Sequence, residues 1–294
     1  MMRATDMETV TDLVIQGGGV PTFLLDRCVA ATGATAVTPL PPKVVRLANA
    51  HINKEFSTEI APLLANEKLD WAFVEQGKKL SDFGLIVFDM DSTLITIECI
   101  DEIADFAGKK HAVAAVTESA MRGEMAYPES LKRRLALLEG LDATALERVY
   151  KERLQITPGA RELIAAAQKA GLRTAVLSGG FTYFTERLQA ELGLDFTHSN
   201  ELEIVDGKLT GHVVGHIVDA KVKANHLLKL CKQLGLQPDQ SIVVGDGAND
   251  IPMMQNAGLS VAYRAKPATR EQASVALNFS DLSGILNLFE GTDA

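Results

Sequence analysis

Short apolar runs alternate with amphipathic stretches from residue 83 onward, and the alternation predicts the main architecture. The apolar runs are typical of buried strands and lie at residues 85–88, 173–177, 241–244 and 259–262. The amphipathic stretches have helical periodicity and lie at residues 158–170, 182–192 and 220–234. An Asp-Gly pair at 206–207 predicts a hairpin within residues 200–214. Strands that alternate with helices predict a parallel sheet with right-handed crossovers, a doubly wound α/β core.

Residues 98–154 interrupt this alternation with a block that is helical almost throughout. Apolar residues such as Ile100, Ile103 and Ala104 recur at the three- and four-residue spacing of an amphipathic helix. The sequence of this block contains no strand signal. It therefore predicts a helical cap, at about residues 96–155, inserted after the first strand of the core.

The first 80 residues predict a separate, smaller α+β domain, which leaves residues 81–294 for the core and its cap. Strands are predicted at 12–16, 35–40, 44–50 and 69–74, and helices at 21–31 and 56–65. The glycine run at 17–19 predicts a plain turn, and no group of catalytic side chains stands out in this part. The polar stretch 75–82 places the domain boundary near residue 80.

The composition is typical of a globular protein, with 47% hydrophobic and 23% charged residues. No apolar run reaches the roughly 18 residues that a membrane span requires. The first residues lack the basic and apolar regions of a secretory signal. Cys28, Cys99 and Cys231 lie far apart, which fits a reducing cytosol better than a disulfide framework. We therefore expect a cytoplasmic protein with no membrane contact, and a homodimer is compatible with the sequence.

The net charge of −9 constrains the partners of the protein. Nucleic acid is not expected to be one of them, because no basic patch is visible in the sequence. A small anionic substrate would be repelled by the overall field. Local cations must therefore bind any such substrate.

Polar side chains with catalytic potential directly follow predicted core strands. They are Asp89 and Asp91 after the first strand, Ser178 and Gly179 after the second, and Asp246, Asn249 and Asp250 after the third. Lys221, near the start of a predicted helix, is a further candidate. Because ligands bind past the carboxyl ends of parallel strands, we expect these groups to converge at one sheet edge. Paired carboxylates there are costly without a cation, and Mg²⁺ with a phosphate ester would relieve that cost.

These motifs, in this order, resemble those of the haloacid dehalogenase superfamily of phosphatases. The segments concerned are Val-Phe-Asp-Met-Asp-Ser-Thr at 87–93, Ser-Gly-Gly at 178–180, Lys221, and Gly-Asp-Gly-Ala-Asn-Asp at 245–250. Each motif alone is weak evidence, but all of them in order, each at a strand end or helix start, are specific. The resemblance covers roughly residues 83–290 and implies the haloacid dehalogenase-like fold.

The resemblance also implies a role for each acidic residue. Asp89 would be the nucleophile, since carboxylates form aspartyl-phosphates in covalent phosphoryl transfer. Asp91 would protonate the leaving oxygen and later take a proton from water. Asp246 would complete a Mg²⁺ site with Asp89 and the main-chain carbonyl of Asp91, and Asp250 would orient these ligands. The phosphate would be bound by Lys221 as a point charge, by the Ser178 hydroxyl and the Gly179 amide as hydrogen-bond donors, and by Asn249.

The chain resembles the phosphoserine phosphatase family in particular. This resemblance rests on Asp-Ser-Thr-Leu at 91–94 with Glu98 beyond it, on Met-Arg-Gly at 121–123, on Ser-Leu-Lys-Arg-Arg at 130–134, and on Ser-Gly-Gly-Phe at 178–181. It implies a Mg²⁺-dependent hydrolase of O-phospho-L-serine. Glu98 would bind the substrate ammonium group, Arg134 would clamp its carboxylate, and Met121 would supply an apolar wall.

Two other interpretations remain open at this point. The same phosphorylated aspartate could pass its phosphoryl group to another alcohol, such as homoserine, because donor and acceptor can share one pocket. Alternatively, residues 1–80 could be the functional centre, as a regulatory module that resembles amino-acid-sensing α+β domains.

Overall fold

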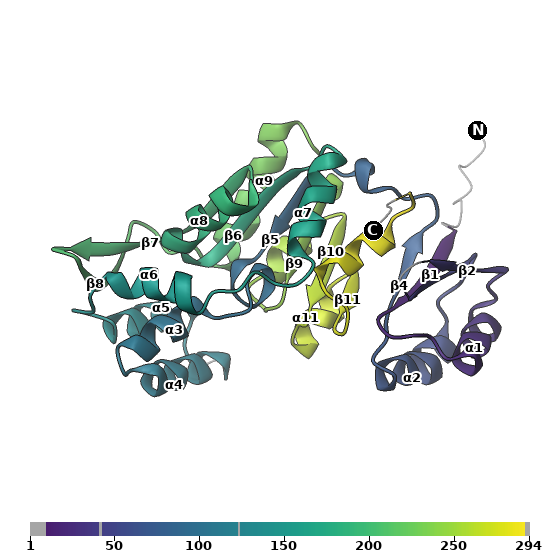
Figure 1. Ribbon diagram of the computed structural model, residues 1–294, viewed down its shortest axis with the longest axis horizontal. Coiled ribbons are helices and arrows are strands. Elements are labelled where there is room, and N and C mark those ends of the chain that lie inside the picture. The colour runs from purple at the N-terminus through teal and green to yellow at the C-terminus, as the bar shows by residue number, and fades with distance from the viewer. Residues whose placement is uncertain (1–9, 41–42, 123, 292–294) are drawn as a thin grey trace, which may run out of the picture.

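The computed structural model describes residues 10–40, 43–122 and 124–291, which form an N-terminal domain beside a larger core domain with a cap (Figure 1). The N-terminal sheet is antiparallel, with four strands in the order β2-β3-β1-β4. Its strands are β1 (Thr11–Gln16), β2 (Ala36–Leu40), β3 (Val44–Ala48) and β4 (Asp70–Glu75). Its helices are α1 (Thr22–Thr32), a π-helical turn at Phe56–Ile60, and α2 (Ala61–Asn66).

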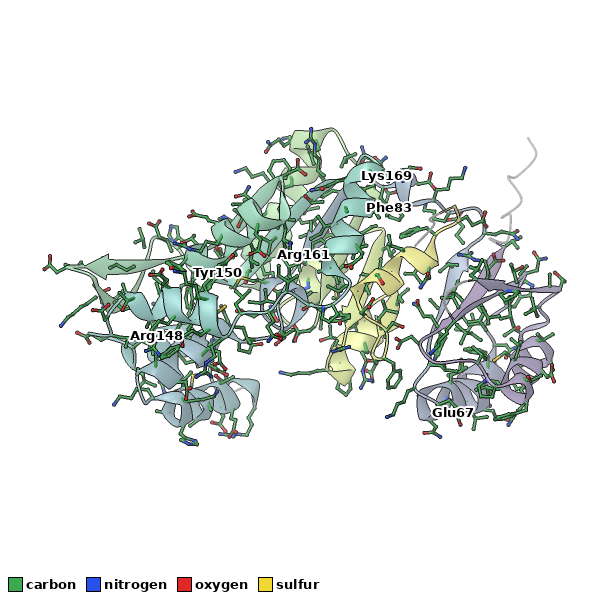
Figure 2. The ribbon with its side chains drawn as sticks, viewed as in Figure 1. Glu67, Phe83, Arg148, Tyr150, Arg161 and Lys169 are labelled. Atoms are coloured by element: carbon green, nitrogen blue, oxygen red, sulfur yellow. The ribbon has the colours of Figure 1, made fainter. Side chains whose placement is uncertain are left out.

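Both faces of this small sheet are covered along β1, β3 and β4, whereas β2 is largely exposed. One face packs on α1 and α2, where Leu13, Leu24 and Phe56 share one apolar cluster. The opposite face carries Val14 and Ala72, which belong to the apolar cluster of the core domain. At this seam Phe83, labelled in Figure 2, packs edge-on against Phe289 with ring centroids 5.7 Å apart. The N-terminal domain therefore has a core of its own and is also docked on the larger domain.

The core domain contains a seven-stranded sheet in the order β11-β10-β9-β5-β6-β7-β8. All neighbours in it pair in parallel except β7 and β8, which form an antiparallel hairpin. The strands are β5 (Leu85–Phe88), β6 (Arg173–Phe181), β7 (Phe196–Val205), β8 (Lys208–Val214), β9 (Ser241–Gly245), β10 (Leu259–Tyr263) and β11 (Val275–Leu277). The order runs outward in both directions from the pair β5 and β9, which confirms the predicted doubly wound α/β core.

Helices cover both faces of the core sheet. They are α7 (Ala160–Lys169), α8 (Thr182–Leu192), α9 (Ala220–Leu234), α10 (Ile251–Met254) and α11 (Pro267–Gln272), followed by a 3₁₀ turn at Leu282–Leu288. Alternate residues of β5 face opposite sides, as a strand requires. Leu85 and Val87 pack with α9 and α10, whereas Ile86 and Phe88 lie in the cluster that contains α7 and α8. None of the helices in the described part of the chain is long and apolar enough to cross a bilayer.

The cap follows β5 and consists of helices. They are α3 (Cys99–Phe106), α4 (Lys110–Met121), α5 (Tyr127–Ala136) and α6 (Thr144–Glu152). The β7–β8 hairpin reaches out to the cap, since the Leu209 carbonyl accepts a hydrogen bond from the Gly140 amide and Gly207 accepts one from Ala143. Gly211 lies against α5, where a β-carbon would approach the Leu135 carbonyl to 3.2 Å.

Two strands differ from the sequence-based expectation. The strand before the hairpin begins at Phe196, and β11 was not predicted at all. Both segments are short in apolar residues, Thr197-His198-Ser199 in one and only Val275–Leu277 in the other. They are strands because β6 and β10 offer unpaired backbone groups beside them, which is information that a local pattern does not contain.

Candidate active site

The parallel register brings the expected strand ends together at one edge of the sheet. Phe88, the last residue of β5, is level with Val176 of β6 and with Val244 of β9. Asp89 is the next residue, and its amide donates to the Val244 carbonyl over 2.9 Å. Asp89 is only 4% exposed although it carries a carboxylate. The acidic side chain that follows the apolar run is therefore almost completely shielded from solvent.

A buried ionic cluster surrounds the Asp89 carboxylate. Lys223 Nζ lies 2.9 Å from Asp89 Oδ1 and 2.6 Å from Asp250 Oδ1. Asn249 Nδ2 donates to Asp89 Oδ2 over 3.0 Å. Burial alone would lower the pKa of Lys223, but the carboxylates of Asp250 and Asp89 outweigh it and raise that pKa above its ordinary value. The ammonium group therefore stays charged in this buried place.

The structure contradicts the expected position of Lys221. Its side chain is exposed, whereas Lys223 is 1% exposed and makes the ion pairs of the site. Two residues along an α-helix are about 200° apart, so the two lysines of α9 point in opposite directions. Lys223 shares the buried face with Leu227 and Leu230. A lysine at helical spacing from these leucines was the sequence signal that could have identified it.

The carboxylates of the site outnumber the cations. Ligand atoms of Asp89, Asp246 and Asp250 all lie within 4.8 Å of one another. Burial and the nearby Asp89 raise the pKa of Asp246 to about 7 and that of Asp250 to about 8, in spite of Lys223. Burial, Glu98 and Asp89 also raise the pKa of Asp91 well above its ordinary value. A dense group of carboxylate oxygens with too little positive charge around it suits a hard divalent cation, which prefers oxygen ligands.

The acidic residues differ in how many hydrogen bonds they accept. Asp250 Oδ2 accepts from the amides of Asp246 and Gly247, each over 3.1 Å, while its Oδ1 faces Lys223. Asp246 accepts from the Thr93 hydroxyl over 3.3 Å. Asp91 Oδ1 accepts from the Cys99 amide over 3.2 Å. Asp250 is therefore bound on both oxygens, whereas Asp246 has lone pairs left for a cation.

Ser178 and the two glycines after it form a cramped cradle at the end of β6. Ser178 is 1% exposed, and its Oγ accepts from the Gly180 amide over 2.9 Å. A β-carbon on Gly179 would lie 2.3 Å from the Tyr127 hydroxyl oxygen, and one on Gly180 would lie 2.5 Å from Met90 Cε. A side chain at either position would displace the end of the Tyr127 or Met90 side chain, so glycine lets both of them lie close to the backbone of the cradle.

Glu98 and Arg134 approach the site from the cap side. Glu98 is exposed, and its Oε1 accepts from the Ser92 hydroxyl over 2.7 Å. Ser92 has a positive φ of 56°, which turns its side chain toward Glu98. Arg134 is half-buried on α5, with its guanidinium 5.9 Å from the centre of the Tyr127 ring. The Met121 side chain and Gly123 lie outside the described residues.

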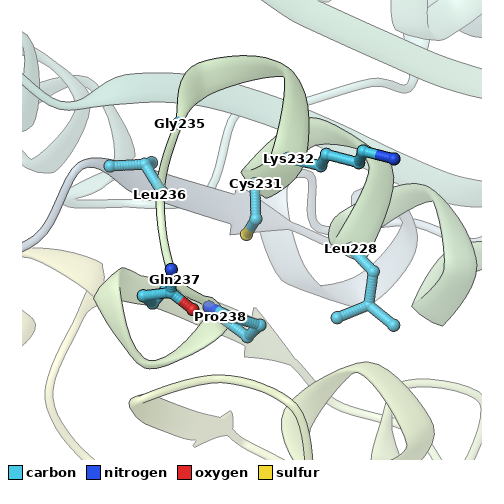
Figure 3. A pocket seen from close by; sticks show the side chains of 7 residues that line it. All are labelled: Leu228, Cys231, Lys232, Gly235, Leu236, Gln237 and Pro238. Carbon is cyan, nitrogen blue, oxygen red and sulfur yellow. The ribbon is translucent and has the colours of Figure 1, made fainter.

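Two hollows lie near α9. One, of about 530 Å³, opens between the cap and the core and is lined by Tyr127, Pro128, Asp219, Ala220, Lys221, Ala224, Pro252, Gln255 and Asn256. Lys221 therefore lines this hollow and is not part of the ionic cluster. The other, of about 370 Å³, lies at the opposite end of α9 beside Leu228, Cys231 and Pro238 (Figure 3). It is remote from the acidic group.

A family model of haloacid dehalogenase-like hydrolases matches residues 83–258, a range that contains the ionic cluster and the Ser178 cradle. The chain belongs to this family. This membership confirms the superfamily resemblance and makes the protein a hydrolase. Enzymes with an open parallel sheet bind their ligands at the carboxyl ends of the strands, which is where the polar groups of this protein gather.

Relatives of this hydrolase carry a consistent description. A phosphoserine phosphatase of a Polaromonas species is 57% identical over 215 residues, covering 71% of this chain and 91% of that protein. A solved structure of a probable phosphoserine phosphatase from Vibrio cholerae, unliganded, has a TM-score of 0.80 and 38% identity, and covers 95% of this chain and 86% of that one. A structure described as a phospho-aspartyl intermediate analogue of phosphoserine phosphatase has a TM-score of 0.67 and 40% identity, and covers 72% and 100%.

Proposed function

We propose that the protein is a Mg²⁺-dependent phosphoserine phosphatase, which hydrolyses O-phospho-L-serine to L-serine and phosphate. As such it would catalyse the last step of L-serine biosynthesis in the cytoplasm. The observation that carries the proposal is the buried Asp89 carboxylate, held by Lys223 and Asn249 at the end of β5. The names of the relatives support the substrate, and the relative solved as an analogue of a phospho-aspartyl intermediate supports the covalent step.

The reaction proceeds in two displacements at phosphorus. Asp89 attacks the phosphoryl group, the bond to the serine oxygen breaks, and Asp91 gives that oxygen a proton. Water then attacks the phosphorylated Asp89 while Asp91 takes a proton from it. Phosphate leaves, and both carboxyl groups return to their starting states. Two contacts support this role of Asp91: its carboxyl group lies beside Gly180 in the cradle and accepts a hydrogen bond from the Cys99 amide.

The remaining groups of the site bind the phosphoryl oxygens. Lys223 replaces Lys221 as the fixed positive charge, and Ser178, Gly179 and Asn249 supply hydrogen bonds. A Mg²⁺ ion held by Asp89, Asp246 and the Asp91 carbonyl would neutralise phosphate charge in the site. Asp250 keeps Lys223 and the Asp246 loop in place through its hydrogen bonds.

Glu98 and Arg134 select the substrate through its amino-acid groups. A screen of O-phospho-L-serine, phosphoethanolamine, phospholactate and glucose 6-phosphate, with and without Mg²⁺, tests this selection. Phosphoserine should exceed the others in kcat/KM by on the order of 10²-fold, because each competitor leaves a charged side chain without its partner. Equal rates on all four would refute the substrate assignment while leaving a phosphatase.

Matched variants separate the two contacts. Arg134→Lys should raise KM for phosphoserine about 10-fold and leave phosphoethanolamine unaffected, because that compound has no carboxylate. Glu98→Gln should have the converse selectivity, with phospholactate unaffected. Arg133→Lys is the control, since Arg133 is exposed on the same helix and pairs with Glu129. An Arg134 variant that loses activity equally on both substrates would contradict the clamp.

The two alternatives from the sequence have direct tests. Transfer to another alcohol would be revealed by a phosphorylated acceptor when homoserine is added, in place of free phosphate. We further propose that the N-terminal domain up to about residue 80 responds to an amino acid, because it resembles amino-acid-sensing α+β domains and has an apolar core of its own. Initial rates of the full chain, measured at increasing L-serine, test that response. Single-turnover experiments measure the catalytic step separately and allow the rates to be corrected for product inhibition.

A further inference from the structure

The carbonyl of Gly179 receives hydrogen bonds from two distant parts of the chain. The Tyr127 hydroxyl, at the first residue of cap helix α5, donates to it over 3.0 Å. Asn200 Nδ2, from β7, donates to it over 2.7 Å. Neither side chain has a role in the chemistry described above, although both meet at the cradle that contains Ser178.

Asn200 is built into the core as a fixed donor. It is 2% exposed, and its Oδ1 accepts from the Val218 amide over 2.8 Å, which orients its amide group. It lies where the pairing of β6 with β7 shifts register, between Leu177 and Phe181. The Gly179 carbonyl therefore lacks a regular strand partner, and side chains take that place.

The carbonyl of Gly179 and the amide of Gly180 belong to one planar trans peptide, so they point in opposite directions. The Gly180 amide donates to Ser178 Oγ over 2.9 Å. That contact occupies one lone pair of the oxygen and leaves the hydroxyl proton of Ser178 to be donated elsewhere. Whatever holds the Gly179 carbonyl consequently sets the direction of the Ser178 hydroxyl.

We infer that Tyr127 and Asn200 are positioning residues that orient the Ser178 hydroxyl toward a phosphoryl oxygen through the Gly179–Gly180 peptide. Asn200 provides the permanent half of this arrangement from the core. Tyr127 provides the half that depends on the cap being docked, so cap closure and phosphate binding are linked by a chain of hydrogen bonds. The inference rests on the proposed function only in that Ser178 binds the phosphoryl group.

The sharpest test is a double-mutant cycle between Tyr127→Phe and Ser178→Ala. The phenylalanine keeps the ring and removes only the hydroxyl. Alone it should lower kcat/KM for phosphoserine roughly 3- to 10-fold, and weaken the calorimetric binding of inorganic phosphate by a similar factor. In the Ser178→Ala background the same change should have no further effect on either quantity.

Tyr150→Phe is the matched control. The Tyr150 hydroxyl, on the α6 side chain labelled in Figure 2, also joins the cap to the core, but it donates over 2.6 Å to Glu191 of α8 and not to the cradle. Its loss should change neither phosphate affinity nor kcat/KM by more than about two-fold. If Tyr150→Phe reproduced the loss seen with Tyr127→Phe, general docking of the cap would explain both and the inference would be wrong.

A third variant tests the core half of the arrangement. Asn200→Ala should weaken phosphate binding at least as much as Tyr127→Phe, again without effect in the Ser178→Ala background, and its unfolding midpoint shows whether the protein is folded. An unchanged phosphate affinity in Tyr127→Phe, or losses that add fully to that of Ser178→Ala, would overturn the inference. Failure of the proposed function is distinguishable: the wild type would then hydrolyse the phosphomonoesters at equal rates or not at all, whereas the binding of inorganic phosphate would still report on the cycle.

Discussion

Two groups of buried charges in this protein are constructed in opposite ways. The seam cluster, Asp12, Arg46 and Asp70, joins the N-terminal domain to the core domain. The edge cluster, Asp89, Asp246, Asp250 and Lys223, lies at the carboxyl edge of the large sheet. Both are removed from water, yet only one of them has the properties of a reactive site.

The seam cluster is satisfied by hydrogen bonds. Asp70 accepts from the amides of residues 278, 279 and 280 over 2.7, 3.0 and 2.7 Å. Asp12 accepts from Arg46 Nη1 and from the Asn49 amide, each over 3.2 Å. Arg46 also donates to the Asn287 carbonyl across the seam. Each buried carboxylate here has donors enough to replace its lost hydration.

The edge cluster has too little positive charge for its carboxylates, although Asp89 and Asp250 accept several hydrogen bonds. One ammonium group serves Asp89 and Asp250, and the pKa values of Asp246 and Asp250 are raised by burial and by Asp89. Burial of charge alone therefore does not mark a functional site. An uncompensated surplus of one sign does, because it is relieved only when a cation binds.

The largest effect is expected from the nucleophile. Asp89→Asn replaces the anionic carboxylate with a neutral amide, which is a poor nucleophile, so kcat should fall by a factor on the order of 10⁴. Stability should be retained, since the change also removes a charge that repels Asp246 and Asp250. Steady-state kinetics and a thermal melt together check both statements. Substantial remaining hydrolysis would contradict the assignment of Asp89.

The lysine pair of α9 gives the next largest effect. Lys223→Met leaves Asp89 and Asp250 without their cation, which should cost about 3–5 kcal/mol of unfolding free energy and on the order of 10²-fold in kcat/KM. Lys221→Met, on the exposed face of the same helix, should change stability by less than about 0.5 kcal/mol. Urea unfolding and kinetics of both variants provide the test. Equal effects would restore Lys221 to the site.

At the seam the expected effect is on stability alone. Asp70→Ala leaves three amides without an acceptor and should lower the unfolding free energy by about 3 kcal/mol. The kinetic constants of the folded protein should be unchanged, because the hydrogen-bond partners of the seam carboxylates all come from the seam and none of them belongs to the edge cluster. Asp26→Ala, at an exposed position in the same domain, is the control. A loss of kcat in Asp70→Ala with a normal unfolding midpoint would show that the seam has a role in catalysis.

The smallest effect concerns pH in the absence of metal. The raised pKa of Asp246, about 7, means that the folded state holds a proton that the unfolded state releases near pH 4. Unfolding free energy should therefore fall as pH rises toward 8, and with EDTA the midpoint should drop by about 5 °C between pH 5 and pH 8.5. Millimolar Mg²⁺ should flatten this slope, and Asp246→Asn should reduce it, with the remainder coming from Asp250 and Asp91, whose pKa values are also raised.

An identical pH profile with and without Mg²⁺ would show that the edge cluster does not bind the ion. The seam variant Asp70→Ala should retain the full wild-type slope at a lower midpoint. This difference separates a general loss of stability from a change in the titrating group.

Most of the fold and the acidic half of the site were predictable from local patterns. A wholly apolar run that ends in an aspartate predicted β5 and the position of Asp89. The same reasoning placed Ser178 and Asp246, because strands in a parallel sheet present the same end to the site. It failed for β11 and for the start of β7, where neighbouring strands supply the partners.

That Lys223 and not Lys221 is buried in the site was predictable in principle from the helical spacing of Lys223 with the buried leucines of α9. For Ser92 and Tyr127 the sequence has no comparable periodic pattern. Ser92 reaches Glu98 only because of a positive φ, and Tyr127 reaches Gly179 only when the cap lies on the core. These contacts join residues from different elements, so no local pattern contains them.

Local sequence patterns specify which groups end the strands, because apolar runs must be buried and the residues that follow them emerge at one edge. How those groups are compensated depends on the three-dimensional fold. It placed one buried lysine among several carboxylates, gave Asp70 a full set of amides, and brought Tyr127 and Asn200 to the same carbonyl. The reason is physical: burial follows from the chemistry of each residue, whereas compensation depends on which distant groups the fold brings within hydrogen-bond distance.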